Sequence, residues 1–531
     1  MRRDSVLSRL RSGADVFDIL VIGGGASGLG AALDAAARGY RVALIEQADF
    51  AQGTSSRSTK LVHGGVRYLK QGDISLVRLA LRERGLLQRN APHLVHSLAF
   101  VIPNYSQFDH WFYRIGMAVY DRLSGQLSLG RSESLSRAET IDSLPTIEPK
   151  GLAGGVLYYD GQFDDARLAI NLAQTAAAHG AAVANYCACV GLLKEQGRVA
   201  GVLARDMESG AEFELRAKVV INATGVFVDA VRRYDEPGAT PLVTVSQGVH
   251  VVLPRRFLPG TRALMVPKTA DGRVLFAIPW HDRLVVGTTD TPGVKAELEP
   301  RAQAAEVDFI LEHAQKYLTT DPTESDVLSV FTGLRPLVRR GSNGHTATRS
   351  RDHTISVSPG QLITLTGGKW TTYRKMAEDV VDQAERVGGF TPRACPTAEL
   401  RIHGAVDPAT IPPDWRIYGS DAAGVRALVQ NDVALGEKLH PELPFRRAEV
   451  VWHARHEMAR TVEDVLARRA RALVLDARAS IAAAPAVARI LARELGRDQR
   501  WIEEQIRTYT VLANGWLLSG SAIAPSVGES H

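Results

Sequence analysis

The sequence is poor in cysteine and contains no long apolar run. Its three cysteines, Cys187, Cys189 and Cys395, form no C-x-x-C pair, which argues against a disulfide framework or a zinc motif and favours the cell interior. Because no stretch of about 20 uncharged apolar residues occurs, no membrane-spanning helix is predicted. The basic start, MRRDSVLSRLRSGADVF, leads into a segment interrupted by Asp18 and Asp34, which argues against a signal peptide.

Charge of one sign is only slightly in excess. The chain has 63 Lys and Arg residues against 58 Asp and Glu, a net charge of +5, which suits an anionic substrate or an anionic membrane surface. Because basic residues are interspersed with acidic ones along the predicted helices, no basic face is expected, and nucleic acid is not an expected partner. A length of 531 residues predicts two or three domains.

The segment from Asp18 to Glu46, DILVIGGGASGLGAALDAAARGYRVALIE, has the pattern of a strand, a glycine-rich turn, a helix and a second strand. Gly23, Gly25 and Gly28 stand in G-x-G-x-x-G spacing, which permits a tight turn, backbone approach to a pyrophosphate and close packing of helix on strand. Glu46 lies where a carboxylate accepts hydrogen bonds from ribose hydroxyls. We therefore predict a dinucleotide-binding unit; the alternative is a glycine-rich turn in an ordinary βαβ unit.

Three later segments combine glycines with hydroxyl-bearing residues. They are GTSSRSTKLVHGGVRYL from Gly53, KVVINATG from Lys218 and QLITLTGGKWTTYRK from Gln361. Hydroxyls can donate to phosphate or flavin oxygens, glycines let the backbone lie flat against a ring, and the third segment predicts a capped helix. Each segment is also explained as an ordinary turn or strand end, because Ser, Thr and Gly favour such positions.

Together these motifs resemble the FAD-dependent glycerol-3-phosphate dehydrogenases, which belong to the D-amino-acid-oxidase-like flavoproteins. The resemblance covers the chain from about Phe17 to about Leu518. It implies FAD as the cofactor and sn-glycerol 3-phosphate as the substrate. It also implies oxidation to dihydroxyacetone phosphate by hydride transfer to FAD, with the electrons passed to a quinone.

The resemblance further implies an α/β fold. We expect a Rossmann-type FAD-binding domain interleaved with a mainly antiparallel β substrate domain, followed by a C-terminal helical cap. The expected boundaries are a basic tail at 1–16, the two interleaved domains at 17–394 and the helical domain at 395–531. Within the interleaved part, the substrate domain is expected at about 80–155 and 240–335.

Specific site residues are implied as well. His250, Arg335 and Lys369 are expected to be catalytic, and Arg67, Tyr68, Arg335 and Arg351 are expected to bind the substrate. No metal ligand is expected. The implied cofactor-binding residues are Ile22, Gly23, Gly24, Gly25, Ala26, Ser27, Gly28, Glu46, Gln47, Thr54, Ser55, Ser56, Lys60, His63, Gly64, Gly65, Ala223, Thr224, Gly225, Gly367, Gly368, Lys369 and Thr371.

His250 is the preferred catalytic base, because a neutral imidazole titrates near working pH. Taken alone, a histidine in an apolar run is more often a satisfied core residue. The chain also departs from the family pattern here, with Gln247 in place of lysine and Val249 in place of serine. The fine contacts to the substrate are therefore not expected to match the family throughout.

A quinone acceptor would require contact with a bilayer, which would be peripheral. The basic N-terminus and the arginine-rich stretches at 74–91 and 449–476 are expected to contribute, at the cytoplasmic face of the cell membrane. Apart from that contact, 449–476 is interpreted as a solvated charged helix with no chemical role. The aromatic residues between 108 and 130 are assigned to the core in preference to a membrane-facing surface. A homodimer is left open.

Three other functions compete with this interpretation. A glycerol-3-phosphate oxidase would pass electrons to oxygen and produce hydrogen peroxide. An NAD-dependent dehydrogenase would use the first motif but leaves the Ala-Thr-Gly and Gly-Gly-Lys segments without an explanation. A basic nucleic-acid-binding flavoprotein would need a clustered basic face, which the interspersed charges do not provide.

Overall fold

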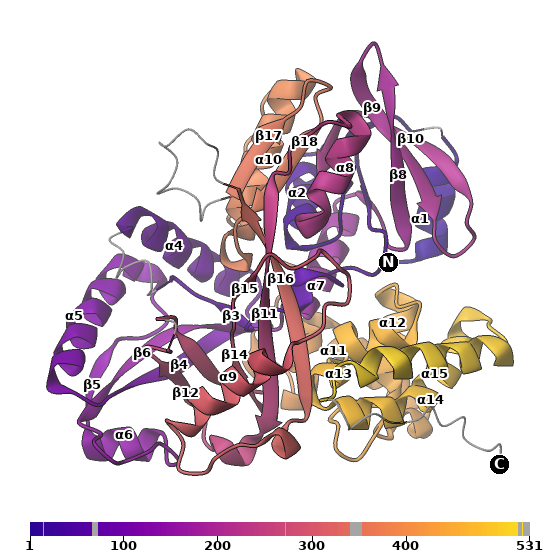
Figure 1. Ribbon diagram of the computed structural model, residues 1–531. Coiled ribbons are helices and arrows are strands. Elements are labelled where there is room, and N and C mark those ends of the chain that lie inside the picture. The colour runs from indigo at the N-terminus through magenta and orange to yellow at the C-terminus, as the bar shows by residue number, and fades with distance from the viewer. Residues whose placement is uncertain (14, 66–72, 271, 340–352, 519–522, 524–531) are drawn as a thin grey trace.

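The structure, a computed structural model, describes residues 1–13, 15–65, 73–270, 272–339, 353–518 and 523. Two sheets form its centre, and helices pack on both of them (Figure 1). The first sheet has the strand order β17–β18–β10–β1–β2–β7, and β10 continues into an antiparallel meander with β9 and β8. Its strands are β1 (Phe17–Ile22), β2 (Val42–Ile45), β7 (Ala182–Ala184), β8 (Cys187–Glu195), β9 (Arg198–Asp206), β10 (Glu212–Asn222), β17 (His353–Val357) and β18 (Ile363–Gly367).

The centre of the first sheet is parallel, because β1 pairs in parallel with both β2 and β10. Its apolar residues are buried on both faces, which explains why the sequence reads as continuous apolar runs there. One face is covered by α2 (Ala26–Ala37), α7 (Asp165–Ala178) and α10 (Tyr373–Gly388). Strands β1 and β18, which begin at residues 17 and 363, thus lie in one sheet, and strands of the second sheet come between them in the sequence. This confirms that the two domains are interleaved, as predicted.

The second sheet is curled and mainly antiparallel. Its strand order is β15–β11–β14–β13–β12–β4–β6–β3, with β16 added beside β11 and β5 beside β6. Only β12 and β4 pair in parallel among these described strands. The strands are β3 (Leu61–Val62), β4 (Val95–Asn104), β5 (Glu133–Ser136), β6 (Gly154–Phe163), β11 (Val243–Pro254), β12 (Ala263–Val266), β13 (Leu275–Trp280), β14 (Arg283–Gly287), β15 (Thr291–Pro292) and β16 (Ser329–Val338).

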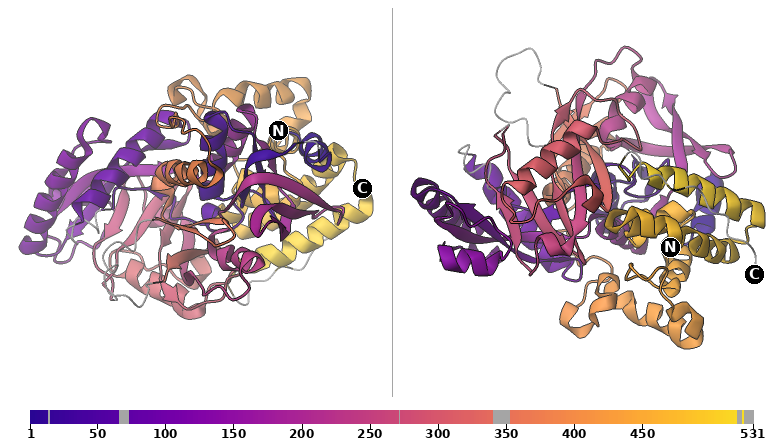
Figure 2. Two further views of the ribbon diagram at one scale, coloured as in Figure 1. Left: turned by 90° about the horizontal axis from the view of Figure 1, so that it is seen from above. Right: turned by 60° about the horizontal axis from the view of Figure 1, so that its bottom comes forward.

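Helices cover the second sheet from three directions. One apolar cluster joins it to α4 (Ile74–Asn90) and α5 (Gln107–Ser124), and another joins it to α6 (Arg137–Ser143) and α9 (Ala304–Gln315). The C-terminal helices pack against Trp280 and Phe331. They lie at the opposite end of the molecule from α5 (Figures 1 and 2). These helices are α12 (Arg447–His456), α13 (Ala472–Leu475), α14 (Ala477–Leu495) and α15 (Gln499–Asn514), while α11 (Ala422–Asn431) packs on α12 in a separate apolar cluster.

The first residues differ from the predicted basic tail, because they form helix α1 (Arg3–Arg11). Leu7 and Leu10 are buried against the outer face of the first sheet, near the β8–β9–β10 meander and α8 (Val228–Asp235). Arg3 and Arg11 both pair with Asp206 at 2.5 Å. Arg3 and Arg11 are therefore engaged in ion pairs within the molecule.

The stretch 449–476 also differs from the prediction of a solvated charged helix. Arg468, Arg469 and Arg471 are almost completely buried, and each forms an ion pair with Asp49 or Asp165 of the N-terminal part of the chain. Arg455 and Arg460 pair with Glu494 and Glu208 respectively. All of these except Arg455 pair with residues of the N-terminal half of the chain, so the stretch is not a free basic surface.

The aromatic segment between 108 and 130 divides into two faces. Met117 and Tyr120 are buried, as assigned, whereas Phe112 is exposed and the core assignment is wrong for it. Phe108 and Trp111, 79% and 63% exposed, lie on the same outer face of α5. Among the described residues, no helix is long and apolar enough to cross a membrane.

The buried pair of Arg167 and Glu457 gives a test of how the C-terminal domain is held. Its two hydrogen bonds measure 2.6 and 2.8 Å, and Arg167 lowers the pKa of the Glu457 carboxyl to about 2. Glu457→Gln leaves a buried guanidinium without its charge partner and should cost about 3–5 kcal/mol of unfolding free energy.

Because the folded-state pKa lies below the ordinary value of 4.5, the pair stabilises the protein above that pH and its contribution is lost as pH falls toward 2. Urea unfolding at several pH values measures both effects. Glu504→Gln, which breaks an exposed pair on α15, is the control and should leave the midpoint unchanged. Equal midpoints for the two variants would contradict the assignment.

Candidate active site

One long cavity, of about 1150 Å³, runs between the two sheets. At one end it is lined by the turn after β1, by Glu46 and by Tyr234 of α8. At the other end it is lined by His250 and Arg335 of the second sheet and by Lys369. A dinucleotide-sized channel therefore opens directly onto a polar pocket.

The first end is shaped by the glycine-rich turn. Gly23 has a φ of +113°, and a Cβ there would lie 2.6 Å from the carbonyl oxygen of Ala223. A Cβ on Gly28 would lie 1.9 Å from the carbonyl oxygen of Gly23, so only glycine lets α2 begin this close to β1. The helix N-terminus consequently reaches the cavity, where its positive dipole end favours phosphate.

Glu46 is held in place by main-chain donors. The Gly24 N–H donates to Oε2 at 2.6 Å, and the Ala48 N–H donates to Oε1 at 2.9 Å. Burial raises the pKa of the Glu46 carboxyl, while these two N–H groups oppose that shift. The carboxylate is thus oriented toward the cavity before any ligand arrives.

The loop after Glu46 lies beside the N-terminus of α2. The Ala26 N–H donates to Ser55 Oγ at 2.9 Å, and Trp370 Nε1 donates to the Ser55 carbonyl oxygen at 2.9 Å. Thr54 and Ser55 begin the short 3-10 helix η1 (Thr54–Ser56) and line the cavity. Three segments distant in sequence therefore meet around the same stretch of the channel.

His250 stands at the polar end of the cavity and is 3% exposed. Its ring stacks on Phe331 at 4.6 Å, and its Nε2 lies 2.9 Å from Thr59 Oγ1. Burial, together with the positive charges of Lys60 and Arg335, lowers the pKa of His250 well below its ordinary value. The imidazole is therefore neutral at physiological pH and can accept a proton.

Arg335 is fixed from several sides. Its guanidinium donates to the carbonyl oxygens of Gln247 and Thr289, and it pairs with Asp290 at 3.0 Å. A Cβ on Gly248 would lie 2.3 Å from Nη2, so this glycine lets the arginine cross the strand. Similarly, a Cβ on Gly287 would lie 2.3 Å from the His250 ring. Two strand glycines thus make room for two site side chains.

His63 and Lys369 complete the polar end. Burial and the nearby charge of Lys369 lower the pKa of His63 to about 4. The main-chain N–H of His63 donates to Thr371 Oγ1 at 3.1 Å, which connects the segment after β3 to the segment before α10. A neutral imidazole and a cation therefore share this part of the cavity. Among the described residues, no group of His, Cys, Asp and Glu side chains could hold a metal ion.

Comparisons with known proteins decide the family. A family model described as FAD dependent oxidoreductase matches residues 18–374, and one described as the C-terminal domain of alpha-glycerophosphate oxidase matches 360–502. A mitochondrial glycerol-3-phosphate dehydrogenase of Arabidopsis thaliana is 41% identical, over 93% of this chain and 85% of its own length. The chain belongs to the FAD-dependent glycerol-3-phosphate dehydrogenases.

Two further relatives agree with this family. The human mitochondrial glycerol-3-phosphate dehydrogenase is 38% identical over 95% of this chain and 74% of its own length. The crystal structure of glycerol-3-phosphate dehydrogenase from Bacillus halodurans, complexed with FAD, has a TM-score of 0.80 at 28% identity. That match covers 98% of this chain and 99% of the other. The predicted fold class and cofactor are therefore confirmed.

The cavity of this dehydrogenase fits FAD. Gly25, at the N-terminus of α2, carries no side chain that would fill the channel, and a Cβ there would approach Ser55 Oγ at 3.1 Å. Gly367 and Gly368 adopt φ values of +78° and +73°, which bend the chain around the far end. Glu46 at one end suits a ribose, and the helix N-terminus beyond it suits a pyrophosphate.

Most of the residues expected in the site line this cavity, although their individual contacts with a ligand stay predictions. Arg67, Tyr68 and Arg351 lie outside the described residues. The residues that line it are Ile22, Gly23, Gly25, Ala26, Ser27, Glu46, Gln47, Thr54, Ser55, His63, Gly65, Ala223, Thr224, Gly225, His250, Arg335, Gly367, Gly368, Lys369 and Thr371.

Five expected cofactor residues lie behind the cavity wall. Gly24 and Gly28 act through packing and main-chain bonds, and the Gly64 N–H donates to the Tyr120 hydroxyl at 2.8 Å. Ser56 and Lys60 face the interior, where Lys60 Nζ donates to the Ser56 carbonyl oxygen at 2.7 Å and to Asp165 at 2.8 Å. Lys60 therefore supports the loop from behind.

Sequence reasoning missed four contributors. Thr59 was not singled out, and only its contact with His250 reveals it. Gly248 and Gly287 carried a usable signal, since a glycine inside a strand pattern marks a close approach. Asp290 follows a strand as an ordinary turn residue, and nothing in the sequence indicates its pairing with Arg335.

Gly248→Ala tests the strand glycines. The added methyl group meets the Arg335 guanidinium, so the arginine must move by more than 0.5 Å to restore normal contact. We expect substrate oxidation to fall at least about tenfold while FAD content stays normal, because a small displacement of a fixed polar group is costly. Steady-state kinetics and the flavin-to-protein absorbance ratio measure the two effects.

Gly238→Ala is the matched control. A Cβ there meets nothing within 4 Å, and the residue is exposed in the loop after α8, so activity should be unchanged. Wild-type turnover in Gly248→Ala would show that the position of Arg335 does not matter for the reaction.

Proposed function

We propose that this chain oxidises glycerol 3-phosphate to dihydroxyacetone phosphate with FAD. The observation that carries the proposal is the single cavity in which a dinucleotide channel opens onto a neutral imidazole and fixed cations. The family membership supports it, because the sequence motifs and the relatives agree along nearly the whole chain. FAD, when bound, supplies the acceptor for the hydride from C2 of the substrate.

His250 is the proposed base for the C2 hydroxyl proton. Its neutral imidazole lines the cavity, and the stacking on Phe331 and the contact with Thr59 fix the ring. Burial, Lys60 and Arg335 all disfavour a charge on the ring, so its pKa lies well below the working range expected from the sequence, and a proton that it accepts is readily passed on. The Thr59 hydroxyl, which also lines the cavity, stands next to Nε2 to take part in this transfer.

The proposed phosphate and oxyanion contacts come from cations. Arg335 and Lys369 line the cavity and bring positive potential to an anionic substrate. Arg335 has most of its donors committed to Asp290 and to main-chain carbonyls, so it supplies a fixed charge more than a flexible clamp. Arg67, Tyr68 and Arg351 remain predicted substrate contacts outside the described residues.

Anaerobic addition of glycerol 3-phosphate to the purified yellow protein tests the reaction. The flavin absorbance should bleach within the dead time of manual mixing, whereas glycerol, which lacks the phosphate, should bleach it at least about a hundredfold more slowly. His250→Gln should slow bleaching by about 10²–10⁴-fold, as expected for the loss of a general base. An absorbance that ignores excess glycerol 3-phosphate would exclude this substrate.

For the electron acceptor we propose a quinone reached by peripheral membrane contact. The outer face of α5 carries Phe108, Trp111, Phe112, Ile115 and Val119, which are 42–79% exposed. Their spacing places them on one side of the helix. Exposed Arg114 and Arg122 of the same helix suit anionic headgroups. An interfacial helix has this combination of aromatic residues and arginines.

The buried face of the same helix contacts residues at the cavity wall. Tyr120 donates from its hydroxyl to Asp160 at 2.8 Å and accepts from the Gly64 N–H at 2.8 Å. Asp160 and Gly65 line the cavity. One helix therefore separates the proposed lipid contact from the cofactor channel, which favours electron transfer to a lipid-soluble acceptor over one in bulk water.

The double variant Trp111→Ser/Phe112→Ser tests this surface. Removing two aromatic side chains from a lipid contact should weaken binding to phosphatidylglycerol vesicles at least about tenfold. Quinone reduction on vesicles should fall in parallel, while reduction of a soluble dye should not change. Co-sedimentation and the two activity assays measure these effects.

Val433→Ser is the control, since Val433 is 82% exposed and lies outside α5, between α11 and α12. Binding of the double variant as tight as that of the wild type would remove α5 from the membrane contact. Stoichiometric oxygen consumption without any response to vesicles would favour the oxidase, whose C-terminal domain model this chain also matches.

A further inference from the structure

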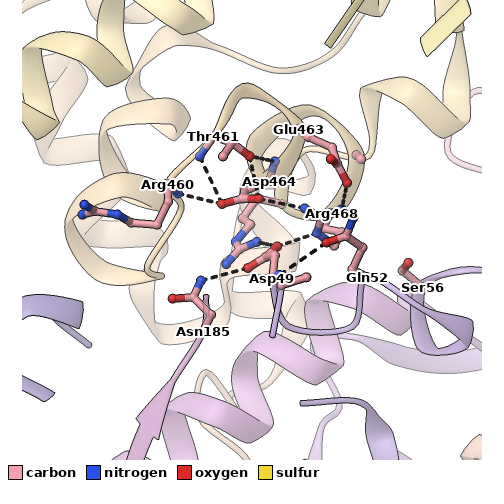
Figure 3. Close-up of polar contacts among 12 residues, drawn as sticks. Asp49, Gln52, Ser56, Asn185, Arg460, Thr461, Glu463, Asp464 and Arg468 are labelled. Atoms are coloured by element: carbon pink, nitrogen blue, oxygen red, sulfur yellow. Dashed lines mark hydrogen bonds and ion pairs between the residues drawn. The ribbon is translucent and has the colours of Figure 1, made fainter. Parts of the chain in front are cut away.

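The C-terminal domain reaches into the cofactor domain through a turn of π-helix, η10 (Asp464–Arg469). Arg468 and Arg469 at its end are 2% and 0% exposed. Both guanidinium groups donate to the same oxygen, Oδ2 of Asp49 (Figure 3 shows the Arg468 contact). Two arginines from one domain therefore close on one carboxylate of the other.

Asp49 belongs to the loop that carries the nucleotide contacts. It lies three positions after Glu46 and five before Thr54. Its other oxygen accepts a hydrogen bond from Asn185 Nδ2 at 3.1 Å, so the carboxylate is fully surrounded. A shift of Asp49 would move the residues that hold both the ribose and pyrophosphate ends of the channel.

The far end of this loop is held in the same way. Arg471 Nη2 donates to the Ser56 carbonyl oxygen at 2.9 Å and to Asp165 Oδ1 at 2.8 Å. Neighbouring arginines of the C-terminal domain thus bind the Glu46–Ser56 loop at Asp49 and at Ser56. These contacts lie outside the cavity, since none of the three arginines lines it.

The arginine pair is itself rigidly placed. Arg468 Nη2 donates to Asp464 at 2.7 Å and Nη1 donates to Glu463 at 2.5 Å. Asp464 also accepts from the hydroxyl of Tyr186, between β7 and β8, at 2.6 Å, which ties it to the first sheet. The network therefore spans the domain junction and leaves Arg468 little freedom to follow a moving loop.

Arg468 also affects the charge of Glu46. Burial raises the pKa of the half-buried Glu46 carboxyl, and the nearby charge of the buried Asp49 raises it further. The charge of Arg468 lowers it again. Without that guanidinium, Glu46 would take up a proton at higher pH and would lose its capacity to accept from ribose hydroxyls.

We propose that Arg468 and Arg469 are positioning residues for FAD, which act from the C-terminal domain through Asp49 to hold the Glu46–Ser56 loop in place. The proposal rests on the proposed contact of Glu46 with the FAD ribose. It gives the C-terminal domain a role in cofactor retention, although neither arginine lines the cavity.

The test measures FAD binding to apo-protein by quenching of flavin fluorescence between pH 5.5 and 8, without substrate. Arg468→Gln should raise the Kd of FAD about tenfold or more at pH 7, and the loss of affinity on acidification should begin at higher pH than in the wild type. Asp49→Asn in the Arg468→Gln background removes the carboxylate charge that Arg468 no longer balances and should return the pH profile toward that of the wild type.

Arg460→Gln is the matched control. Arg460 forms a two-bond ion pair with Glu208 across the same two domains, at 2.7 and 2.8 Å, but away from the loop. Its loss should leave the Kd and the pH profile unchanged. Far-UV circular dichroism of each apo-protein identifies variants that fail to fold, and the Asp49→Asn combination then carries the test.

Wild-type Kd and pH profile in folded Arg468→Gln would overturn the proposal, and so would an equal effect of Arg460→Gln. Glu46→Gln separates it from the underlying assignment. If Glu46→Gln binds FAD normally, the ribose contact is wrong; if it binds weakly while Arg468→Gln binds normally, only the positioning role is wrong.

Discussion

The structure depends on carboxylates that are buried at the junction of its domains and neutralised by arginines from distant parts of the chain. Asp165 lies at the start of α7 and pairs with both Lys60 and Arg471. Because an unpaired buried charge costs several kcal/mol, neither side of the junction is complete without the other. The Glu46–Ser56 loop lies directly on this junction. The geometry of the nucleotide site therefore depends on how the C-terminal helices dock.

The polar end of the cavity follows a different constraint, which is space. His250 and Arg335 project from adjacent strands of a closely packed sheet, and each finds room only where the facing strand carries a glycine. Their fixed positions follow from stacking, ion pairing and main-chain acceptors around them. A site built on strands in this way keeps its cations and its imidazole in place before a substrate enters.

Much of the fold could be predicted from local patterns. The first motif combined a strand, a turn and a helix with Glu46 in the expected place, and the resemblance extended this to the interleaved domains. What could not be predicted depends on contacts between distant residues. The stretch 449–476 was read as a solvated helix because its arginines alternate with apolar residues, and a sequence pattern does not distinguish a guanidinium in water from one buried on Asp49. The exposed face of α5 was misjudged for the same reason, since aromatic residues at helical spacing serve a core and an interface equally well.

The interleaving has a consequence for synthesis of the chain. The first sheet receives β18 only at residue 363, and the aspartates behind the cofactor loop meet Arg468, Arg469 and Arg471 later still. A ribosome-bound chain that has been made as far as α7 therefore carries carboxylates, on Asp49 and Asp165, whose arginine partners have not yet been synthesised. Loop closure over more than 400 residues must precede the last ion pairs, which makes their formation a late step. A truncated chain that lacks these arginines cannot complete the junction. Its buried aspartates stay without their partners, so a full-length chain is needed for a stable domain junction.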